Sequence, residues 1–547
     1  MRVVLLLSAL VTLCAGCATA PESMQASAGS TSAIDVPVVA HPDGESAAWW
    51  YRAGAARAAA NGAMAGRARN VILFLGDGMS LPTVAAARIL EGQRHRASGE
   101  ENALAFERFP YTALSKTYNT DYQTPDSAGT MTAIATGAKT RLGMIGVGQA
   151  AVRGDCASAS GASLLSIVEL AESAGLATGI VTTTRITHAT PASVYAHVPD
   201  RNWEDDAHLP AAARGAGCTD IAAQLVATPF GDGPEVVLGG GRGRFQPTSI
   251  RDPEHNDQAG LRLDDRDLVA EWQRQHPDGR YVWNAQQLTA AAVAPRVLGL
   301  FEPSHLLYDT DRLRTAATTD PSLADLTRAA LRTLQRSGKG YVLVVEGGRI
   351  DHAHHDGNAR RALEETIAFS DAIRAADEMS GDDTLILVTA DHAHTMHFAG
   401  YPRRGNPILG KVQGISGEED DNAPWALGRD GLPYTTLGYA NGPGHVDPAT
   451  ARGARPDLTK VDTEALDYLQ EAHVPMSAET HGGDDVGIWA RGPGAQAVRG
   501  TVEQNVIYHL LVQATPALRA RLCAAGTCNA EGVPVDLPKP DDFKATR

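Results

Sequence analysis

Short stretches of largely apolar residues recur along the chain, and each has the length of a β-strand. They cover residues 71–75, 179–183, 235–238, 341–345, 384–388 and 486–489. Because their apolarity is continuous rather than alternating, we expect strands that are buried on both faces. Helical patterns separate them, as over 163–174 and 360–378. This order predicts an α/β fold, a three-layer α/β/α sandwich with a mainly parallel central sheet.

Two further stretches frame this alternation. An Ala-rich helical pattern over 46–68, which carries Trp49, Trp50 and Tyr51, precedes the first strand. Residues 401–478 interrupt the alternation of strand and helix patterns, because they contain many Gly, Pro and acidic residues and few long apolar runs. We interpret 401–478 as a loop-rich inserted subdomain that lies over or beside the functional site, rather than as a separate folding unit.

The first sixteen residues have the character of a targeting segment. Arg2 supplies a positive charge, and the apolar core from Val3 to Leu13 is too short for a permanent membrane-spanning helix. Residues 13–17, Leu-Cys-Ala-Gly-Cys, resemble a bacterial lipoprotein cleavage site that would leave Cys17 lipidated at the N-terminus. The alternative is ordinary cleavage after Ala20, which the following proline would hinder.

Either route of cleavage predicts export, to the periplasm or as an outer-membrane or cell-surface lipoprotein. Contact with a membrane is then expected only through the lipid anchor. Residues 17–45 are rich in Ser, Ala and Gly, which is typical of a flexible tether.

Export makes disulfide bonds possible, and four cysteines would remain after processing. None of them has the close CxxC spacing of a structural zinc site, so two disulfides are the favoured interpretation. Cys523 with Cys528 would close a short loop and leave Cys156 to pair with Cys218. The alternative is four free, buried thiols.

The charge balance limits the partners of the chain. A formal net charge of −16 argues against binding to a nucleic-acid backbone. It does not exclude small anionic substrates, because a pocket lined with metal ions can reverse the sign of the local potential.

The densest candidate chemistry lies in residues 346–357, Glu-Gly-Gly-Arg-Ile-Asp-His-Ala-His-His-Asp-Gly, directly after the apolar run 341–345. Three carboxylates and three imidazoles are costly to crowd together unless a cation lies among them. Asp351 and His355 are four residues apart, so a helix would place both on one face. A carboxylate and an imidazole are suitable ligands for a zinc-like ion.

Other polar residues also follow strands, where ligands bind in parallel α/β sheets. Asp77 stands between two glycines after the first strand, and Asp391 with His392 follows the fifth. Taken alone, Asp77 is equally typical of a turn or a helix cap. A lone His481 before the last strand is equally typical of a structural histidine.

Two further residues each allow a functional and a purely structural interpretation. Ser127 follows Pro125 at a predicted helix start, where it is either a cap or a nucleophile favoured by the helix dipole and a metal. Arg201 is either a surface charge or an anion ligand.

Together these motifs resemble the alkaline phosphatases, and among them the animal-type branch, over about residues 46–528. The resemblance implies that 46–547 is a single catalytic domain carrying the 401–478 insertion. It identifies Ser127 as the serine that becomes phosphorylated and Arg201 as the phosphate clamp. It implies a site with two zinc ions and one magnesium ion, whose ligands would be Asp77, Thr190, Glu346, Asp351, His355, Asp391, His392 and His481.

The resemblance carries further expectations. His188 and His352 stand where the enteric bacterial type has Asp and Lys, which supports the animal-type assignment, as does the separation of Cys156 and Cys218. The family is typically homodimeric, and the helix with Trp49 and Trp50 is a candidate interface element. The animal-type calcium site would correspond to Glu254, Phe301 (through its carbonyl), Glu302 and Asp320.

The expected activity is hydrolysis of small phosphate monoesters through a phosphoserine intermediate. The rival within the superfamily is a phosphodiesterase, but Thr190, Glu346 and Arg201 suit a terminal dianion. A sulfatase would need a different motif around its nucleophile. From another class of protein, a non-catalytic metal- or phosphate-binding lipoprotein has no need of Ser127.

Overall fold

The apolar runs form a ten-stranded sheet, shown in a computed structural model that describes residues 44–315, 320–414, 425–445 and 455–545. The strands are mainly parallel, and β14 is the one that runs antiparallel to both of its neighbours. In spatial order they are β15 (Thr501–Glu503), β2 (Tyr111–Lys116), β14 (Val486–Arg491), β8 (Thr384–Ala390), β1 (Asn70–Gly76), β7 (Tyr341–Gly347), β3 (Ala177–Arg185), β4 (Val236–Gly240), β6 (Val297–Leu300) and β5 (Arg280–Val282).

Both faces of the sheet are buried, which accounts for the continuous apolar runs. In β1, Leu73 belongs to one hydrophobic core and Phe74 to the other. The first core takes in the apolar residues of α1 (Ala47–Ala60), α3 (Ser127–Thr136), α4 (Ile167–Ser173), α7 (Ile221–Val226) and α16 (Val506–Ala514). The second takes in those of α2 (Leu81–Arg94), α12 (Leu323–Ser337) and α14 (Ala359–Met379).

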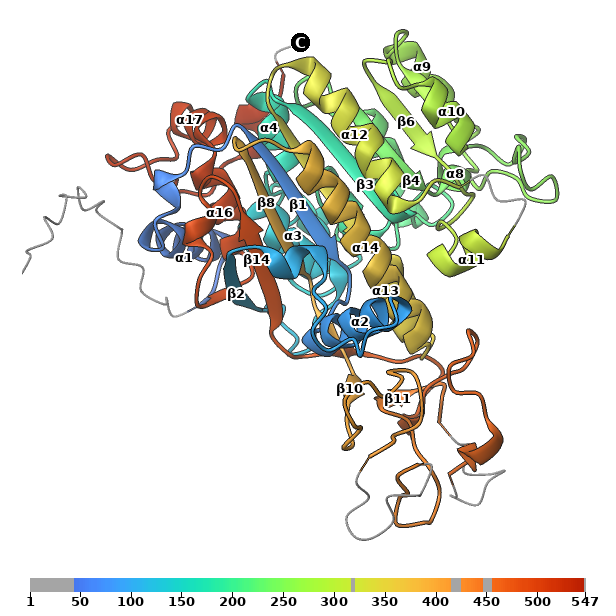
Figure 1. Cartoon of the computed structure of the whole chain (residues 1–547). Helices are drawn as coiled ribbons and strands as arrows, with labels where there is room; N and C mark the ends of the chain where they lie inside the picture. The colour runs from blue at the N-terminus through green and yellow to red at the C-terminus, as the bar shows by residue number, and fades with distance from the viewer. Residues whose placement is uncertain (1–43, 316–319, 415–424, 446–454, 546–547) are drawn as a thin grey trace, which may run out of the picture. The chain divides into compact units, whose positions relative to one another are not determined.

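Helices therefore cover the sheet on both sides, and α12 and α14 cross it together in Figure 1. The remaining helices are α5 (Ala189–Ala192), α6 (Ala211–Gly215), α8 (Arg242–Phe245), α9 (Leu268–Gln275), α10 (Ala285–Ala290), α11 (Asp309–Arg314), α13 (Arg349–His355) and α17 (Pro516–Ala524). The predicted α/β fold with a mainly parallel sheet is confirmed. No helix in the described part of the chain is both long and apolar enough to cross a bilayer.

The segment 401–478 contributes little regular structure. Its described residues supply β11 (Leu437–Gly442) and β12 (Ala472–Pro475), which form a small sheet with β10 (Met396–Phe398). It is bound to the main body where α13 ends and α14 begins: Gln470 N donates to the carbonyl of Gly357 at 3.0 Å, and the Asn358 side chain donates to the carbonyl of Leu466 at 2.7 Å. The segment therefore lies beside a helix that carries two of the predicted metal ligands.

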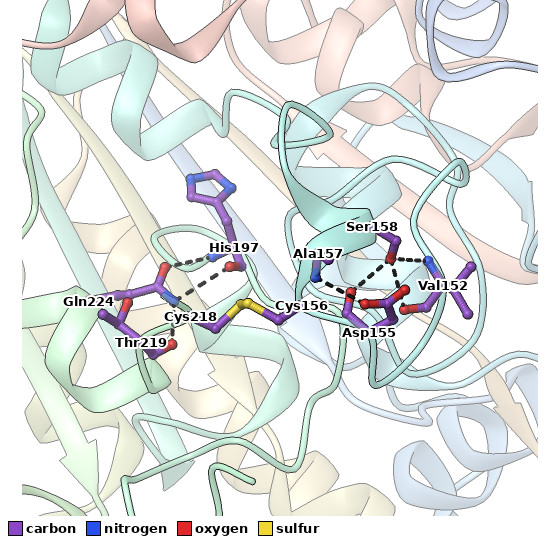
Figure 2. Close-up of a disulfide and its surroundings, with 9 residues drawn as sticks. All are labelled: Val152, Asp155, Cys156, Ala157, Ser158, His197, Cys218, Thr219 and Gln224. Carbon is purple, nitrogen blue, oxygen red and sulfur yellow. Dashed lines mark hydrogen bonds between the residues drawn. A yellow bond between two sulfur atoms is a disulfide. The ribbon is translucent and has the colours of Figure 1, made fainter. Parts of the chain in front are cut away.

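Two disulfides are present, Cys156–Cys218 and Cys523–Cys528. Figure 2 shows the first, which joins the turn at Asp155 to the start of the segment that leads into α7. Beside it the Gln224 side chain donates to the carbonyl of Thr219 at 3.0 Å. The predicted targeting segment, Cys17 and most of the tether lie outside the described residues.

Candidate metal centre and active site

The carboxyl ends of β1, β7 and β8 bring three predicted ligand segments together. In the register of the sheet Leu75 pairs with both Glu346 and Thr389, and Gly76 pairs with Ala390. Asp77 and Asp391, which follow β1 and β8, are therefore neighbours at one edge of the sheet. Each of their carboxyl groups is fully buried.

The helix α13 starts directly after β7 and places Asp351 and His355 on one face. His355 Nε2 lies 3.3 Å from Asp351 Oδ1. His481, in the short strand β13 (His481–Gly482), comes from a distant part of the chain, and its Nε2 lies 3.4 Å from the same oxygen and 3.1 Å from His355 Nε2. Three of the predicted metal ligands thus converge on one point.

Ser127 is the first residue of α3, and its hydroxyl faces the carboxylate cluster. Its Oγ lies 3.3 Å from Asp77 Oδ1 and 3.2 Å from His392 Nε2. The cap of this helix is Asp126, whose Oδ1 accepts from the backbone nitrogen of Gly129 at 3.1 Å. The alternative of Ser127 as the helix cap is wrong, because Asp126 already accepts the first free N–H groups.

Glu346 and Thr190 lie on the other side of Asp77. Thr190 Oγ1 donates to Asp77 Oδ2 at 3.4 Å. Glu346 Oε2 accepts from the hydroxyls of Thr182 and Thr184, the latter at 3.1 Å. Glu346 Oε1 is buried and has no hydrogen-bond partner among the described residues. Such a buried carboxylate oxygen is a ready metal ligand.

Sequence reasoning gave no role to His394, which the structure places inside the cluster. Its Nε2 lies 2.9 Å from Asp351 Oδ1, and its Nδ1 lies 2.5 Å from Glu479 Oε2. The carboxylate of Glu479 also accepts from Thr395 at 2.6 Å. His394 lies two residues after His392, and this spacing at a strand end was the available signal.

Burial and the charge of Asp77 raise the pKa values of two neighbouring carboxyl groups. Burial and the charge of Asp77 raise the pKa of Asp391 to about 6, and the same two causes hold that of Glu346 well above its usual range. Burial opposes protonation of His392, but the carboxylates of Asp391 and Asp77 overcome it and raise its pKa to about 10. Repulsion of this kind is relieved when a cation lies among the carboxylates.

The donor atoms fall into compact groups that suit metal ions. Each group keeps its ligand atoms within 4.8 Å of one another. The groups are Asp351, His392, His394 and His481; His355, His394 and Glu479; Asp77, Asp391 and His392; and Asp77, His188 and Glu346. Imidazole with carboxylate suits zinc, and oxygen-rich sets suit magnesium, so the residues fit such ions. His188 joins the last group, although the family resemblance does not count it among the metal ligands.

Arg201 is oriented toward the cluster by two contacts. Its NH1 donates to Asp126 Oδ2 at 2.9 Å, and its NH2 donates to His188 Nε2 at 3.2 Å. Only 20% of its side chain is exposed. The interpretation of Arg201 as a solvated surface charge is therefore wrong.

The predicted calcium ligands lie in a separate part of the chain. The charge of Glu302 and burial together raise the pKa of Asp320 to about 7, and burial is the larger cause. Glu254 is bound to Arg242 at 2.9 Å, and Glu302 to His255 at 3.0 Å. Phe301 is fully buried. Carboxylates thus gather here, and Glu254 and Glu302 have cationic or imidazole partners.

Comparisons with known proteins agree with this geometry. A family model described as alkaline phosphatase matches residues 68–517. The chain is 45% identical to an alkaline phosphatase of Gadus morhua over 458 residues, which cover 82% of this chain and 92% of that protein. It is 44% identical to the tissue-nonspecific isozyme of Gallus gallus over 456 residues, covering 82% of this chain and 84% of that protein.

Solved structures show the same fold. The alkaline phosphatase of Thermus thermophilus matches with a TM-score of 0.58 and 26% identity, over 83% of this chain and 92% of that one. The enzyme of the Antarctic bacterium TAB5 matches with a TM-score of 0.55 and 22% identity, over 82% and 98% of the two chains. The resemblance to the animal-type branch is confirmed by the fish and bird relatives, and the chain belongs to the alkaline phosphatase family.

Proposed function

We propose that this protein hydrolyses phosphate monoesters at a metal-dependent site, with Ser127 as the nucleophile. The observation that carries the proposal is the position of the Ser127 hydroxyl, within 3.3 Å of both Asp77 and His392 at the N-terminus of α3. A serine buried among carboxylates and imidazoles has no evident structural purpose there. The helix dipole also favours negative charge at this end.

Two zinc ions and one magnesium ion match the donor groups. Asp351, His355 and His481 would hold one zinc, Asp77, Asp391 and His392 the other, and Asp77, Thr190 and Glu346 the magnesium. When bound, such ions stabilise the serine alkoxide, the leaving oxygen and the non-bridging phosphate oxygens. His394 and Glu479 would orient the zinc ligands from behind.

The residues of the chain then perform two displacements. In the first, Ser127 Oγ gives its proton to solvent and forms a bond to phosphorus, while the bond from phosphorus to the ester oxygen breaks and the leaving alkoxide takes a proton from solvent to become the alcohol. In the second, water attacks the phosphoserine, the serine oxygen leaves and regains a proton, and inorganic phosphate is released. Atoms and charges balance over the two steps.

Arg201 would bind two phosphate oxygens through its planar guanidinium. Asp126 fixes this side chain, and it also caps the helix that carries Ser127. One carboxylate therefore positions both the nucleophile and the clamp. His188 and His352, next to the clamp, would tune the site.

A phosphodiesterase of the same superfamily is the principal rival, and a non-catalytic metal- or phosphate-binding lipoprotein is the other. Comparing the turnover of p-nitrophenyl phosphate with that of its bis-ester distinguishes the monoesterase, the phosphodiesterase and the non-catalytic binding protein. We expect the monoester to react faster by at least roughly a hundred-fold, because Arg201 and the Thr190–Glu346 side crowd a second ester group. Faster diester turnover would support the rival, and no turnover of either would support the binding protein.

Ser127→Ala tests the nucleophile. We expect a loss of monoester turnover of roughly a thousand-fold or more, with unchanged zinc content by elemental analysis. Ser173→Ala, which removes a hydroxyl bonded only within α4, is the matched control. Acid quenching during turnover should show one phosphoryl group on the wild-type peptide that contains Ser127. Full activity of the variant would exclude Ser127 as the nucleophile.

The remaining expectations stand as parts of this proposal. They are export directed by residues 1–16, lipidation at Cys17, a tether to residue 45, one catalytic domain over 46–547 and a homodimer. Calcium at Glu254, Phe301, Glu302 and Asp320 is a further part, supported by the pKa of Asp320, which burial and Glu302 raise to about 7.

A further inference from the structure

Three imidazoles pack edge to face beside the phosphate clamp. The ring centroids of His188 and His305 are 5.5 Å apart, those of His188 and His352 are 5.4 Å apart, and those of His305 and His352 are 4.3 Å apart. They come from three segments distant in sequence. We call these three residues the histidine wall.

Guanidinium groups flank the wall on each side. Arg201 donates to His188 at 3.2 Å, and Arg349 NH1 lies 2.9 Å from His352 Nδ1. Two imidazole rings therefore separate the clamp from Arg349. Both ring nitrogens of His305 lie against Arg185, Nδ1 at 3.1 Å from its backbone nitrogen and Nε2 at 2.5 Å from its NH1.

The three arginines differ in how their charge is balanced. Arg201 pairs with Asp126, and Arg185 binds Glu204 through two bonds of 2.7 Å. Arg349 forms no ion pair with any carboxylate in the described part of the chain, and its Nε has no hydrogen-bond partner there. Its guanidinium instead lies 3.7 Å from the centre of the Tyr308 ring.

The nearby acidic groups bond to residues other than Arg349. Asp356 accepts from the Tyr308 hydroxyl at 2.8 Å. Glu365 accepts from the backbone of Asp309, and burial raises its pKa to about 8, so it is mostly uncharged at neutral pH. Among the described residues, the Arg349 guanidinium therefore has no carboxylate in direct contact at this end of the wall.

The histidine wall also presents hydrogen-bond donors. A guanidinium has donors only, so the imidazole nitrogens that face Arg201 and Arg349 must accept. In the neutral rings the opposite nitrogens, His188 Nδ1 and His352 Nε2, then carry the protons. His188 Nδ1 is buried and has no partner among the described residues. The His352 Nε2 donor beside the Arg349 guanidinium favours an anion at this end of the wall.

We propose that Arg349 and His352 form a second anion subsite beside the phosphate clamp. The preferred substrates are then phosphate monoesters that carry a second anionic group, a carboxylate or another phosphate, a few bonds from the ester. This inference rests on the proposed function, since the first phosphate must bind at Arg201. It names a substrate class that the metal centre alone does not select.

The test compares glycerol 3-phosphate with glycerate 3-phosphate, which differ by one carboxylate. We expect the wild type to have a kcat/KM at least roughly five-fold higher for the glycerate ester, mostly through KM, because a charge-assisted hydrogen bond is added. Arg349→Gln should lower the ratio of the two values to about one. Arg361→Gln is the matched control and should keep the ratio, because Arg361 also covers Tyr308, at 5.5 Å, but is paired with Asp311 and Asp467.

The wild type supplies a second measurement in case Arg349→Gln does not fold. The preference for glycerate 3-phosphate should decline as ionic strength rises, since salt screens the added charge. A ratio near one for the wild type, or an unchanged ratio in Arg349→Gln, would overturn the subsite while leaving the phosphatase proposal intact. Absence of turnover of either ester would instead refute the proposed function. The ratio of kcat/KM for fructose 1,6-bisphosphate to that for fructose 6-phosphate tells whether the subsite accepts a second phosphate as it accepts a carboxylate.

Discussion

His394 illustrates how much a single side chain depends on its surroundings. Its two ring nitrogens lie 2.9 Å from Asp351 and 2.5 Å from Glu479. Burial opposes a charge on the ring, but Glu479 and Asp351 hold its pKa above the usual value. A carboxylate and imidazole pair behind a metal ligand fixes the orientation of that ligand. His394 is thus positioned to act through Asp351 rather than on the substrate.

We expect His394→Gln to weaken zinc binding by roughly 10- to 100-fold, because Asp351 loses its orienting partner. Competition with a chromogenic chelator measures the affinity. His197→Gln is the control, since His197 forms a similar 2.7 Å pair with Glu169 outside the cluster. Equal zinc affinity in the two variants would show that His394 has no such role.

Asp126 both caps α3 and bonds to Arg201, and two variants of Asp126 should separate these two roles. Asp126→Ala removes both the cap of α3 and the 2.9 Å bond to Arg201, so we expect a loss of about 1 kcal/mol in unfolding free energy and a higher KM. Asp126→Asn keeps a capping oxygen but loses the charge beside Arg201. Its stability should stay near that of the wild type, while KM still rises.

Thermal unfolding and monoester kinetics on both variants provide the measurements. A KM that rises only in Asp126→Ala would show that the cap, rather than the charge, positions Arg201.

At the level of helices and strands, local patterns predicted the buried elements well. The expected helix over 360–378 is α14, Ala359–Met379, and the expected strand over 384–388 is β8. The predicted helix over 46–68 ends earlier, at Ala60, because Asn61 and Gly62 close it and Gly62 adopts a positive φ of 91°. Alanine content alone does not reveal such an end.

The strands at the margins of the sheet were missed. Most residues of β2 are at least partly exposed, and β5 and β15 have three residues each. Short or exposed strands lack the continuous apolar run that marks a buried one. They are stabilised by pairing with a neighbour, which is a property of the whole sheet.

The helix α4 offers a test of stability against pH. Glu172 is buried and receives bonds from Thr178 at 2.5 Å and Gly233 at 3.1 Å, and burial raises its pKa from 4.5 to about 8. Because the folded pKa lies above the unfolded one, the protonated form is favoured in the native state. The favourable contribution of Glu172 to the free energy of unfolding is therefore greatest below about pH 4.5 and is lost as the pH rises toward 8.

Glu172→Gln mimics the protonated form and should remove this loss. We expect the variant to gain on the order of 3 kcal/mol relative to the wild type between pH 5 and pH 9. Denaturant unfolding at the two pH values gives the difference directly. A constant difference across this range would mean that Glu172 stays charged in the native state.

For the molecule as a whole, the metal centre should couple activity to stability. Its buried carboxylates include Asp77, Asp351 and Asp391, which repel one another without a cation. Prolonged exposure to a strong chelator should abolish turnover and lower the Tm by roughly 5–10 °C. Zinc should restore both more completely than magnesium alone.

Scanning calorimetry with parallel monoester assays checks this expectation. Ser127→Ala, inactive but with intact ligands, should show the same change in Tm. Turnover that survives exhaustive chelation would rule out the metal-dependent mechanism.

The linear chain already specified the buried strands, the helix that places Asp351 and His355 on one face, and the ligand types at the strand ends. These features are local, because side-chain periodicity and short spacings act over a few residues. Only the tertiary structure decided which of these groups meet. Strand order and register bring residues 77, 127, 351, 391 and 481 together and add His394 and Glu479 behind them. They also leave Arg349 beside His352 with no carboxylate bonded to it among the described residues. Such contacts depend on how distant segments pack, which no local pattern contains.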